Sequence, residues 1–160
     1  MLRMTGALGL SVMLALAVAC GGGGGGGGGG DDGATPTPAA DLTRSAEAGG
    51  ITVDGTWLVA EGVGEVDADL SAYPLDEFVL IEIGFTTHSG DLNELDMEQA
   101  SGLKQGGEAA VPVAWVSLSD DSHHREGILV FERTEADGAV ELTVALAGSE
   151  VALVWEVIPT

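Results

Sequence analysis

The sequence predicts an all-β protein with a single antiparallel β-sandwich, immunoglobulin-like in the broad sense, after a Gly-rich linker that we expect to be disordered. Two observations predict this fold. Short runs of apolar and β-branched residues recur between residues 51 and 158, and glycine- or proline-containing turns separate them. Only residues 91–103 hint at a helical turn, and they fit an irregular edge segment equally well. The predicted sandwich domain spans residues 51–160.

Each predicted strand rests on alternating apolar and polar side chains or on an unbroken apolar run. The stretch ITVDGTWLVA (51–60) alternates, whereas FVLIEIGF (78–85) is almost entirely apolar, as for a strand that is covered on both faces or central in a sandwich. The other predicted strands are residues 62–70, 111–118, 128–133, 140–146 and 151–158. The best hairpin signal is Asp137–Gly138. The predicted core aromatics are Trp57, Trp115, Phe131 and Trp155.

Residues 1–19 have the features of a secretory signal peptide: Arg3, then an apolar run, then small residues before Cys20. The run is too short for a confident membrane-spanning helix. The residues LAVAC (16–20) resemble the lipobox of bacterial lipoproteins. This resemblance implies cleavage before Cys20 and a lipid on that cysteine, which would anchor an extracytoplasmic protein to the cell membrane. A soluble secreted protein and an uncleaved signal anchor are the alternatives.

Residues 20–50 are predicted to be a lipidated cysteine followed by a tether. Ten consecutive glycines at 21–30 precede the stretch DDGATPTPAAD. A coil of about 30 such residues spans roughly 30 Å, enough to hold a domain clear of a membrane surface. Cys20 is the only cysteine of the chain, so no disulfide forms within it and the core alone must hold the fold.

The charge of the chain excludes some classes of partner. Asp and Glu number 26 against 5 Lys and Arg, which gives a formal net charge of −21. Nucleic-acid-binding proteins carry basic patches, and docking on anionic lipid headgroups also needs basic residues. The expected partners are therefore a membrane, through the lipid, and a metal ion. Strong acidity also suits a salty environment.

The sequence offers little for catalysis. Ser89 directly follows His88, but a nucleophile and its base must meet through space, which adjacent residues seldom do. No Gly-x-Ser-x-Gly nucleophile elbow is present, and Cys20 is assigned to the lipid. We therefore predict that the protein is not an enzyme and assign no catalytic residue.

Metal binding is the leading functional hypothesis. Imidazole is a good ligand for Zn, Cu and Ni, and carboxylates can complete such a site. His88 ends a predicted strand, while His123 and His124 lie in a loop before the next one. Such loops often gather at one end of a sandwich. Neighbouring strand residues point to opposite faces, so only one of the pair should face His88. Asp91 and Glu126 are the nearest carboxylates. A blue-copper site is excluded because it needs a cysteine thiolate.

Four stretches resemble a recurring module of extracytoplasmic bacterial and archaeal proteins that has no established activity. They are THSGDL (87–92), PVAW (112–115), HHREGILVF (123–131, with Val130 variable) and the tryptophan at 155. The stretch SLSDDS (117–122) departs from the module. The resemblance implies that the polar motif residues form one linked cluster: His88, Asp91, His123, His124, Arg125 and Glu126.

Two hypotheses follow for this cluster. In the first, a membrane-anchored binding module captures or senses a transition-metal ion, with Cu or Zn the expected cofactor. In the second, the sandwich is a structural or protein-interaction domain, and the cluster ties loops together without a metal. In that second case Arg125 and Glu126 would form ordinary surface or hairpin pairs, each worth at most about 1 kcal/mol.

Overall fold

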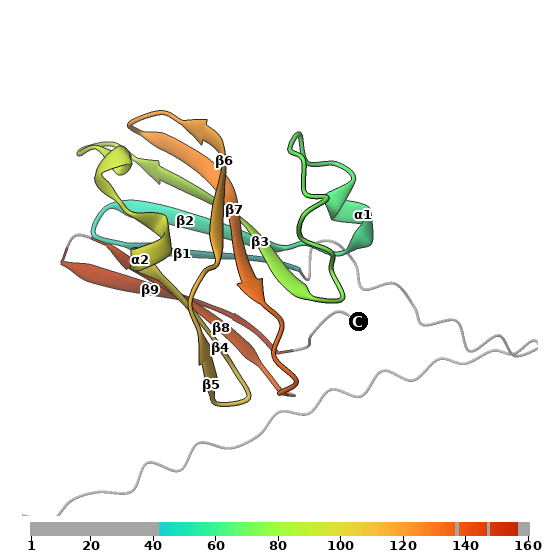
Figure 1. Ribbon diagram of the computed structural model, residues 1–160. Coiled ribbons are helices and arrows are strands. Elements are labelled where there is room, and N and C mark those ends of the chain that lie inside the picture. Colours follow the sequence, from blue (N-terminus) through green and yellow to red (C-terminus); the bar gives the residue numbers. More distant parts are fainter. Residues whose placement is uncertain (1–41, 137, 147, 157–160) are drawn as a thin grey trace, which may run out of the picture. The chain divides into compact units, whose positions relative to one another are not determined.

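The computed structural model describes residues 42–136, 138–146 and 148–156. Figure 1 shows these residues as two packed antiparallel β-sheets, which confirms the predicted all-β sandwich. The strands belong to one compact unit, Thr35–Thr160. No helix in the described ranges is long and apolar enough to cross a membrane. The predicted signal peptide and Cys20 lie outside these ranges.

The first sheet has five strands in the order β1-β2-β3-β7-β6, and the second has four in the order β5-β4-β8-β9. Their bounds are β1 (Thr43–Ala48), β2 (Ile51–Trp57), β3 (Phe78–Thr87), β4 (Ser101–Gln105), β5 (Glu108–Ala110), β6 (Ala114–Asp120), β7 (His124–Glu132), β8 (Val140–Leu146) and β9 (Ser149–Trp155). Three short helical segments are α1 (Ala60–Val63), η2 (Leu92–Glu94) and α2 (Met97–Ala100).

The main core lies between the two sheets. Alternate residues of each strand point into it, as the period of two in a β-strand requires. Three of the predicted core aromatics, Trp57, Phe131 and Trp155, are buried there. Trp57 and Trp155 pack edge to face with ring centres 5.9 Å apart. The fourth, Trp115, is only partly buried, because it lies on the edge strand β6.

A second, smaller core covers part of the outer face of the first sheet. Leu80 from β3 and Ile128 and Val130 from β7 are buried beneath Leu58, Leu70 and their neighbours. Most of those neighbours belong to α1 and to the irregular chain that follows it, which lie beside the first sheet in Figure 1, and the others belong to β3 and β6. The prediction that residues 78–85 are covered on both faces is therefore confirmed for the β3 segment around Leu80.

Several predicted elements need correction. Residues 62–70 form no strand but carry the end of α1 and a run of turns. The domain boundary predicted at residue 51 is too late, because β1 already pairs with β2 along its whole length. Asp137 lies outside the described residues, but no hairpin joins β7 to β8, since these strands belong to different sheets. β4 and β5 also arise where no strand was predicted.

Candidate functional site

The two halves of the sequence motif meet at one end of the sandwich. The backbone N–H of Thr87 donates to the carbonyl of His123 at 3.0 Å, and that of Leu92 donates to the carbonyl of Ser122 at 2.9 Å. The loop after β3 therefore lies against the hairpin that joins β6 to β7, and both lie at the same end in Figure 1. The predicted gathering of these loops is confirmed.

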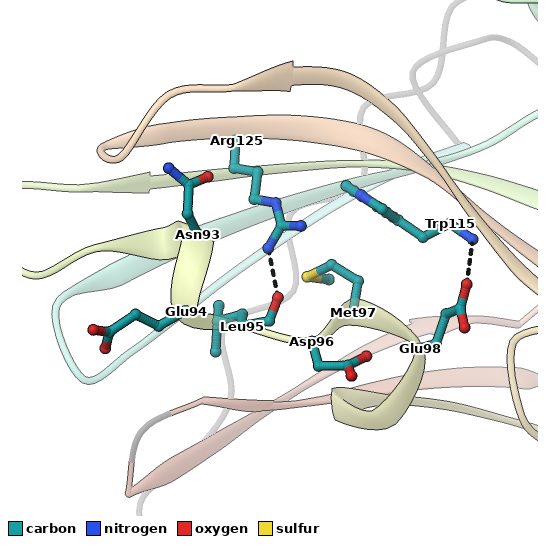
Figure 2. Close-up of a pocket in the computed structure, with 8 residues that line it drawn as sticks. All are labelled: Asn93, Glu94, Leu95, Asp96, Met97, Glu98, Trp115 and Arg125. Atoms are coloured by element: carbon teal, nitrogen blue, oxygen red, sulfur yellow. Dashed lines mark hydrogen bonds between the residues drawn. The ribbon is translucent and has the colours of Figure 1, made fainter.

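Arg125 joins the two loops from inside the protein. It shares the inward face of β7 with Gly127 and Leu129, and only 9% of its surface is exposed. Its Nη1 donates to the carbonyl of Leu92 at 3.0 Å and to that of Leu95 at 2.6 Å. Figure 2 shows the guanidinium reaching into the bend of the 93–98 loop. Of the two kinds of pair that the second hypothesis expected for Arg125, a surface pair is wrong because the side chain is buried, whereas a pair across the β6–β7 hairpin is present, with Asp120.

Two further contacts hold this guanidinium in place. Its carbon lies 5.3 Å from the centre of the Trp115 ring, within the range of a cation–π interaction. Its Nε lies 3.5 Å from Oδ1 of Asp120. A buried charge is costly unless it is paired and hydrogen-bonded, and here carbonyls, an aromatic ring and a carboxylate supply that compensation.

Gly127 explains how Trp115 can lie so close to Arg125. A Cβ atom at position 127 would stand 2.4 Å from Cζ2 of Trp115 and 2.6 Å from the carbonyl oxygen of Val116. The indole therefore crosses the backbone where no side chain exists. The Arg-x-Gly part of the motif thus has a packing reason: the arginine holds the loop, and the glycine leaves room for the tryptophan.

The three histidines are all exposed, in contrast to Arg125. His124 lies on the outer face of β7 opposite Thr86, and its Nδ1 is 3.3 Å from the Thr86 hydroxyl. The ring of His123 approaches the hydroxyl of Ser122 at 3.4 Å. His124 and Arg125 point to opposite faces of the sheet, as the alternation along a strand requires. That only one of His123 and His124 faces His88 stays a prediction.

The carboxylates near the histidines have separate surroundings. Asp91 accepts from the backbone N–H of Asn93 at 2.9 Å and so caps η2. Asp121 accepts from the N–H of His123 at 2.9 Å, and this bond lowers the pKa of Asp121. Both side chains therefore have backbone partners close in sequence, which is typical of Asp at turns.

Glu126 lies on the outer face of β7, on the same side as His124. A Cβ atom at Gly84 would be 3.7 Å from its Cγ, so the Glu126 side chain extends over this glycine of β3. Partial burial raises the pKa of Glu82, and the charge of Glu126 raises it further. The exposed part of this face is therefore acidic, beside one imidazole.

Within the described ranges, no group of three or more His, Cys, Asp or Glu side chains is placed to hold a metal ion. Of the predicted ligands, His124 and Glu126 share one face of β7. Asp91 caps η2, in the loop that follows β3. The metal site at His88, His123, His124, Asp91 and Glu126 stays a prediction.

Beside Arg125 lies a recess of about 420 Å³ that sequence reasoning missed. Figure 2 shows its lining, which is Asn93, Glu94, Leu95, Asp96, Met97, Glu98, Trp115 and Arg125. Glu98 of α2 accepts from the backbone N–H of Trp115 in β6 at 3.2 Å, which joins two sides of the recess. Asp96 accepts from the N–H of Gln99 at 3.2 Å and caps α2. This Asp-x-x-Gln spacing resembles a capping box and could have predicted α2.

Arg44 and Arg133 bind main-chain carbonyls in the same way as Arg125. Arg44 Nε donates to Val154 at 2.7 Å, and Arg133 Nη2 donates to Leu75 at 2.8 Å. Arg133 borders a second recess of about 520 Å³, which is lined by Trp57, Leu58, Val59, Ala60, Glu61, Leu75, Asp76 and Arg133. The arginines of the described domain therefore hold its backbone together.

The chain was compared with families, proteins and structures already known. No protein-family model matches it, and no curated protein and no solved structure is significantly similar to it.

Proposed function

We propose that this protein is a non-enzymatic, lipid-anchored interaction domain outside the cytoplasm, whose motif residues tie two loops together and hold a recognition surface in shape. The observation that carries this proposal is the position of Arg125. Its side chain is buried, and it bonds to the carbonyls of Leu92 and Leu95 in the neighbouring loop.

Thr87 and Asp91, two other residues of the motif, support the same proposal because their side chains bind within the chain. The hydroxyl of Thr87 donates to the carbonyl of Ser89 at 2.8 Å, and Asp91 caps η2. Trp115 lies across Gly127. A polar group that is satisfied internally stabilises the fold, whereas a group kept for a ligand is more often left exposed or without a partner.

The recess beside Arg125 is the surface that these contacts hold in place. The carboxylates of Glu94, Asp96 and Glu98 surround it, and the partly exposed Leu95 and Trp115 add apolar area. A protein partner that presents a lysine or arginine beside an apolar side chain would complement this surface in charge and in shape.

Metal capture is the second candidate function. The observation that favours it is the shared face of His124 and Glu126, which are two residues apart on β7 and both exposed. Imidazole and carboxylate together suit Zn or Cu, and His88 from the adjoining loop would complete the predicted site.

One experiment separates the two functions. Both cores consist of residues between Leu42 and Trp155, so the unit Thr35–Thr160 carries its own core and can be produced alone. It would be titrated with Cu(II), Zn(II) and Ni(II) by calorimetry, as parent and as the variants His88→Ala and His123→Ala/His124→Ala. Unfolding by denaturant would be measured for the same proteins and for Arg125→Met.

The interaction domain predicts no metal binding at micromolar concentration and unchanged stability of the histidine variants. Arg125→Met should lose about 2–5 kcal/mol, because it leaves two loop carbonyls without their donor. Micromolar binding that disappears in the histidine variants would establish metal capture instead. An Arg125→Met variant as stable as the parent would contradict the role given to this arginine.

Lipid anchoring is tested separately, with the full chain. Replacing Cys20 by Ser removes the thiol that would carry the lipid. The parent chain should sediment with membranes, and the Cys20→Ser chain should not. Equal distribution of both chains would contradict the anchor and leave the roles of the folded domain untouched.

A further inference from the structure

Within the described ranges no element covers the outer face of the second sheet, whereas α1 and the chain after it cover part of the outer face of the first sheet. We call it the second-sheet face. It consists of the exposed or half-buried residues that alternate with core residues along β4, β8 and β9. These are Gly102, Lys104, Glu141, Thr143, Ala145, Glu150, Ala152 and Val154.

The strand register makes the centre of this face low and weakly polar. Gly102, Thr143 and Ala152 lie side by side across the three strands. The Thr143 hydroxyl donates to the carbonyl of Gly102 at 3.3 Å, so its hydrogen bond is made within the sheet. Val154, 36% exposed, adds one of the few large apolar side chains on the surface of the described domain. Small central side chains allow another sheet to approach closely.

The charges of the face differ from those of the whole chain. The protein has a net charge of −21, but this face combines one lysine with Glu141 and Glu150. Lys104 forms no ion pair with any of the described residues, although Glu141 lies directly opposite it on β8. By contrast, Arg44, Arg125 and Arg133, the arginines of the described domain, bind carbonyls. Lys104 is therefore a cation placed on the surface without a partner in the described domain.

We propose that the second-sheet face is a self-association surface, on which a second copy of this chain packs sheet against sheet. Two strongly acidic copies repel each other over most of their surfaces, and repulsion is weakest where carboxylates are few and a lysine is present. A two-fold contact is self-complementary, so one face must supply both the cation and its partner. This face carries both.

The register identifies the pair. Lys104 and Glu150 lie at diagonally opposite corners around Thr143, because Lys104 is two residues from Gly102 on β4 and Glu150 is two residues from Ala152 on β9. The two-fold axis lies between the two faces, passes over Thr143 and runs perpendicular to the line from Lys104 to Glu150. It then places Lys104 of each copy over Glu150 of the other. The contact then has an apolar centre with a charge pair at two corners.

The test measures the oligomeric state of Thr35–Thr160 by sedimentation equilibrium from micromolar to millimolar concentration. A dimer is expected. Ala152→Glu, which adds a charge at the centre, and Lys104→Glu should each weaken association by at least about tenfold. Lys104→Glu/Glu150→Lys should restore it, because the exchange rebuilds the pair. Thr52→Glu, on the outer face of the first sheet, is the matched control and should leave association unchanged.

Three results would overturn the proposal: a monomer throughout the concentration range, association that Ala152→Glu does not weaken, or failure of the charge exchange to restore association in variants with the parent's circular dichroism. If Ala152→Glu fails to fold, the comparison of Lys104→Glu with the exchange variant decides, since both substitutions lie at exposed positions.

Discussion

Two glycines on neighbouring strands have different roles, although both face side chains from across the sheet. At Gly127 an added Cβ would stand 2.4 Å from the Trp115 ring, closer than any van der Waals contact allows. At Gly84 it would stand 3.7 Å from Glu126, an ordinary contact. Neither glycine has a positive φ, so the comparison isolates packing from backbone strain.

We therefore expect Gly127→Ala to lower the free energy of unfolding by about 1–3 kcal/mol or more, because the indole must leave its place beside Arg125. Gly84→Ala is the matched control and should change stability by no more than about 0.5 kcal/mol. Denaturant unfolding of both variants checks the prediction. Equal losses would show that Trp115 does not depend on the missing side chain at 127.

Glu82 gives the fold a pH dependence of known sign. Its pKa is raised above the usual 4.5 by burial and by the charge of Glu126. The folded state therefore holds a proton more readily than the unfolded state. The resulting loss of stability sets in as the pH rises from about 4.5 through the raised pKa, and it is complete above it.

Glu82→Gln should accordingly stabilise the domain at pH 7 and have little effect below pH 4, where the carboxyl is protonated in both states. The gain should stay under about 1 kcal/mol, because water screens a group this exposed. Thermal unfolding at both pH values measures it. Glu47→Gln, on the exposed face of β1, is the control for loss of one charge, and an equal gain there would remove the special role of Glu82.

At the scale of single residues, the sequence predicted the place of the motif better than its chemistry. The expected meeting of the two loops is confirmed, but the burial of Arg125 was not predicted. The reason is that β7 begins at His124, whereas the predicted strand began at Ile128. Leu129 and Phe131 point inward, and the alternation along a strand gives Arg125 the same direction only if the strand includes the polar residues before Ile128.

At the scale of elements, strands with large β-branched side chains were predictable and strands with small or polar ones were not. β3, β8 and β9 carry such apolar runs, and β8 has the predicted bounds. β1 reads TRSAEA, and its inward residues are mostly alanines. β4 and β5 are built from residues with low strand propensity, and pairing decides their conformation: β4 pairs with β8, and β5 pairs with β4.

The corrected boundary makes a prediction about where the domain can be cut. Leu42 is buried in the main core, and its carbonyl accepts the indole N–H of Trp155 at 2.7 Å. A chain that starts at Ile51 loses both contacts and the whole of β1. We expect it to be at least about 3 kcal/mol less stable than Thr35–Thr160, from lost burial and an orphaned indole.

Denaturant unfolding of the two chains measures the difference. A chain that starts at Leu42 is the control, because it keeps every described contact and should match Thr35–Thr160. If the chain from Ile51 were as stable as these two, β1 would be a dispensable addition to the sheet.

At the scale of the whole molecule, the partnership of strands depends on contacts that no local pattern contains. Asp137–Gly138 is a strong turn signal, yet β7 before it and β8 after it belong to different sheets. The first sheet instead pairs β7 with β3, a strand about 40 to 55 residues earlier in the sequence. The fold class followed from composition and period, whereas the order of strands required the structure.

The last prediction rests on the net charge of −21 and concerns how the stability of the domain depends on salt. Folding brings many carboxylates closer together, so their mutual repulsion opposes the compact state. Salt shortens the range of that repulsion, from roughly 30 Å at 0.01 M to about 3 Å at 1 M. The melting temperature of Thr35–Thr160 should therefore rise with NaCl concentration. A gain of 1 kcal/mol corresponds to about 4 °C for a domain of this size.

Glu82→Gln/Glu126→Gln, which removes two neighbouring charges, should show a smaller rise. A melting temperature that stays level or falls with NaCl would mean that the internal hydrogen bonds of the arginines, and not repulsion among carboxylates, dominate the electrostatics of this fold.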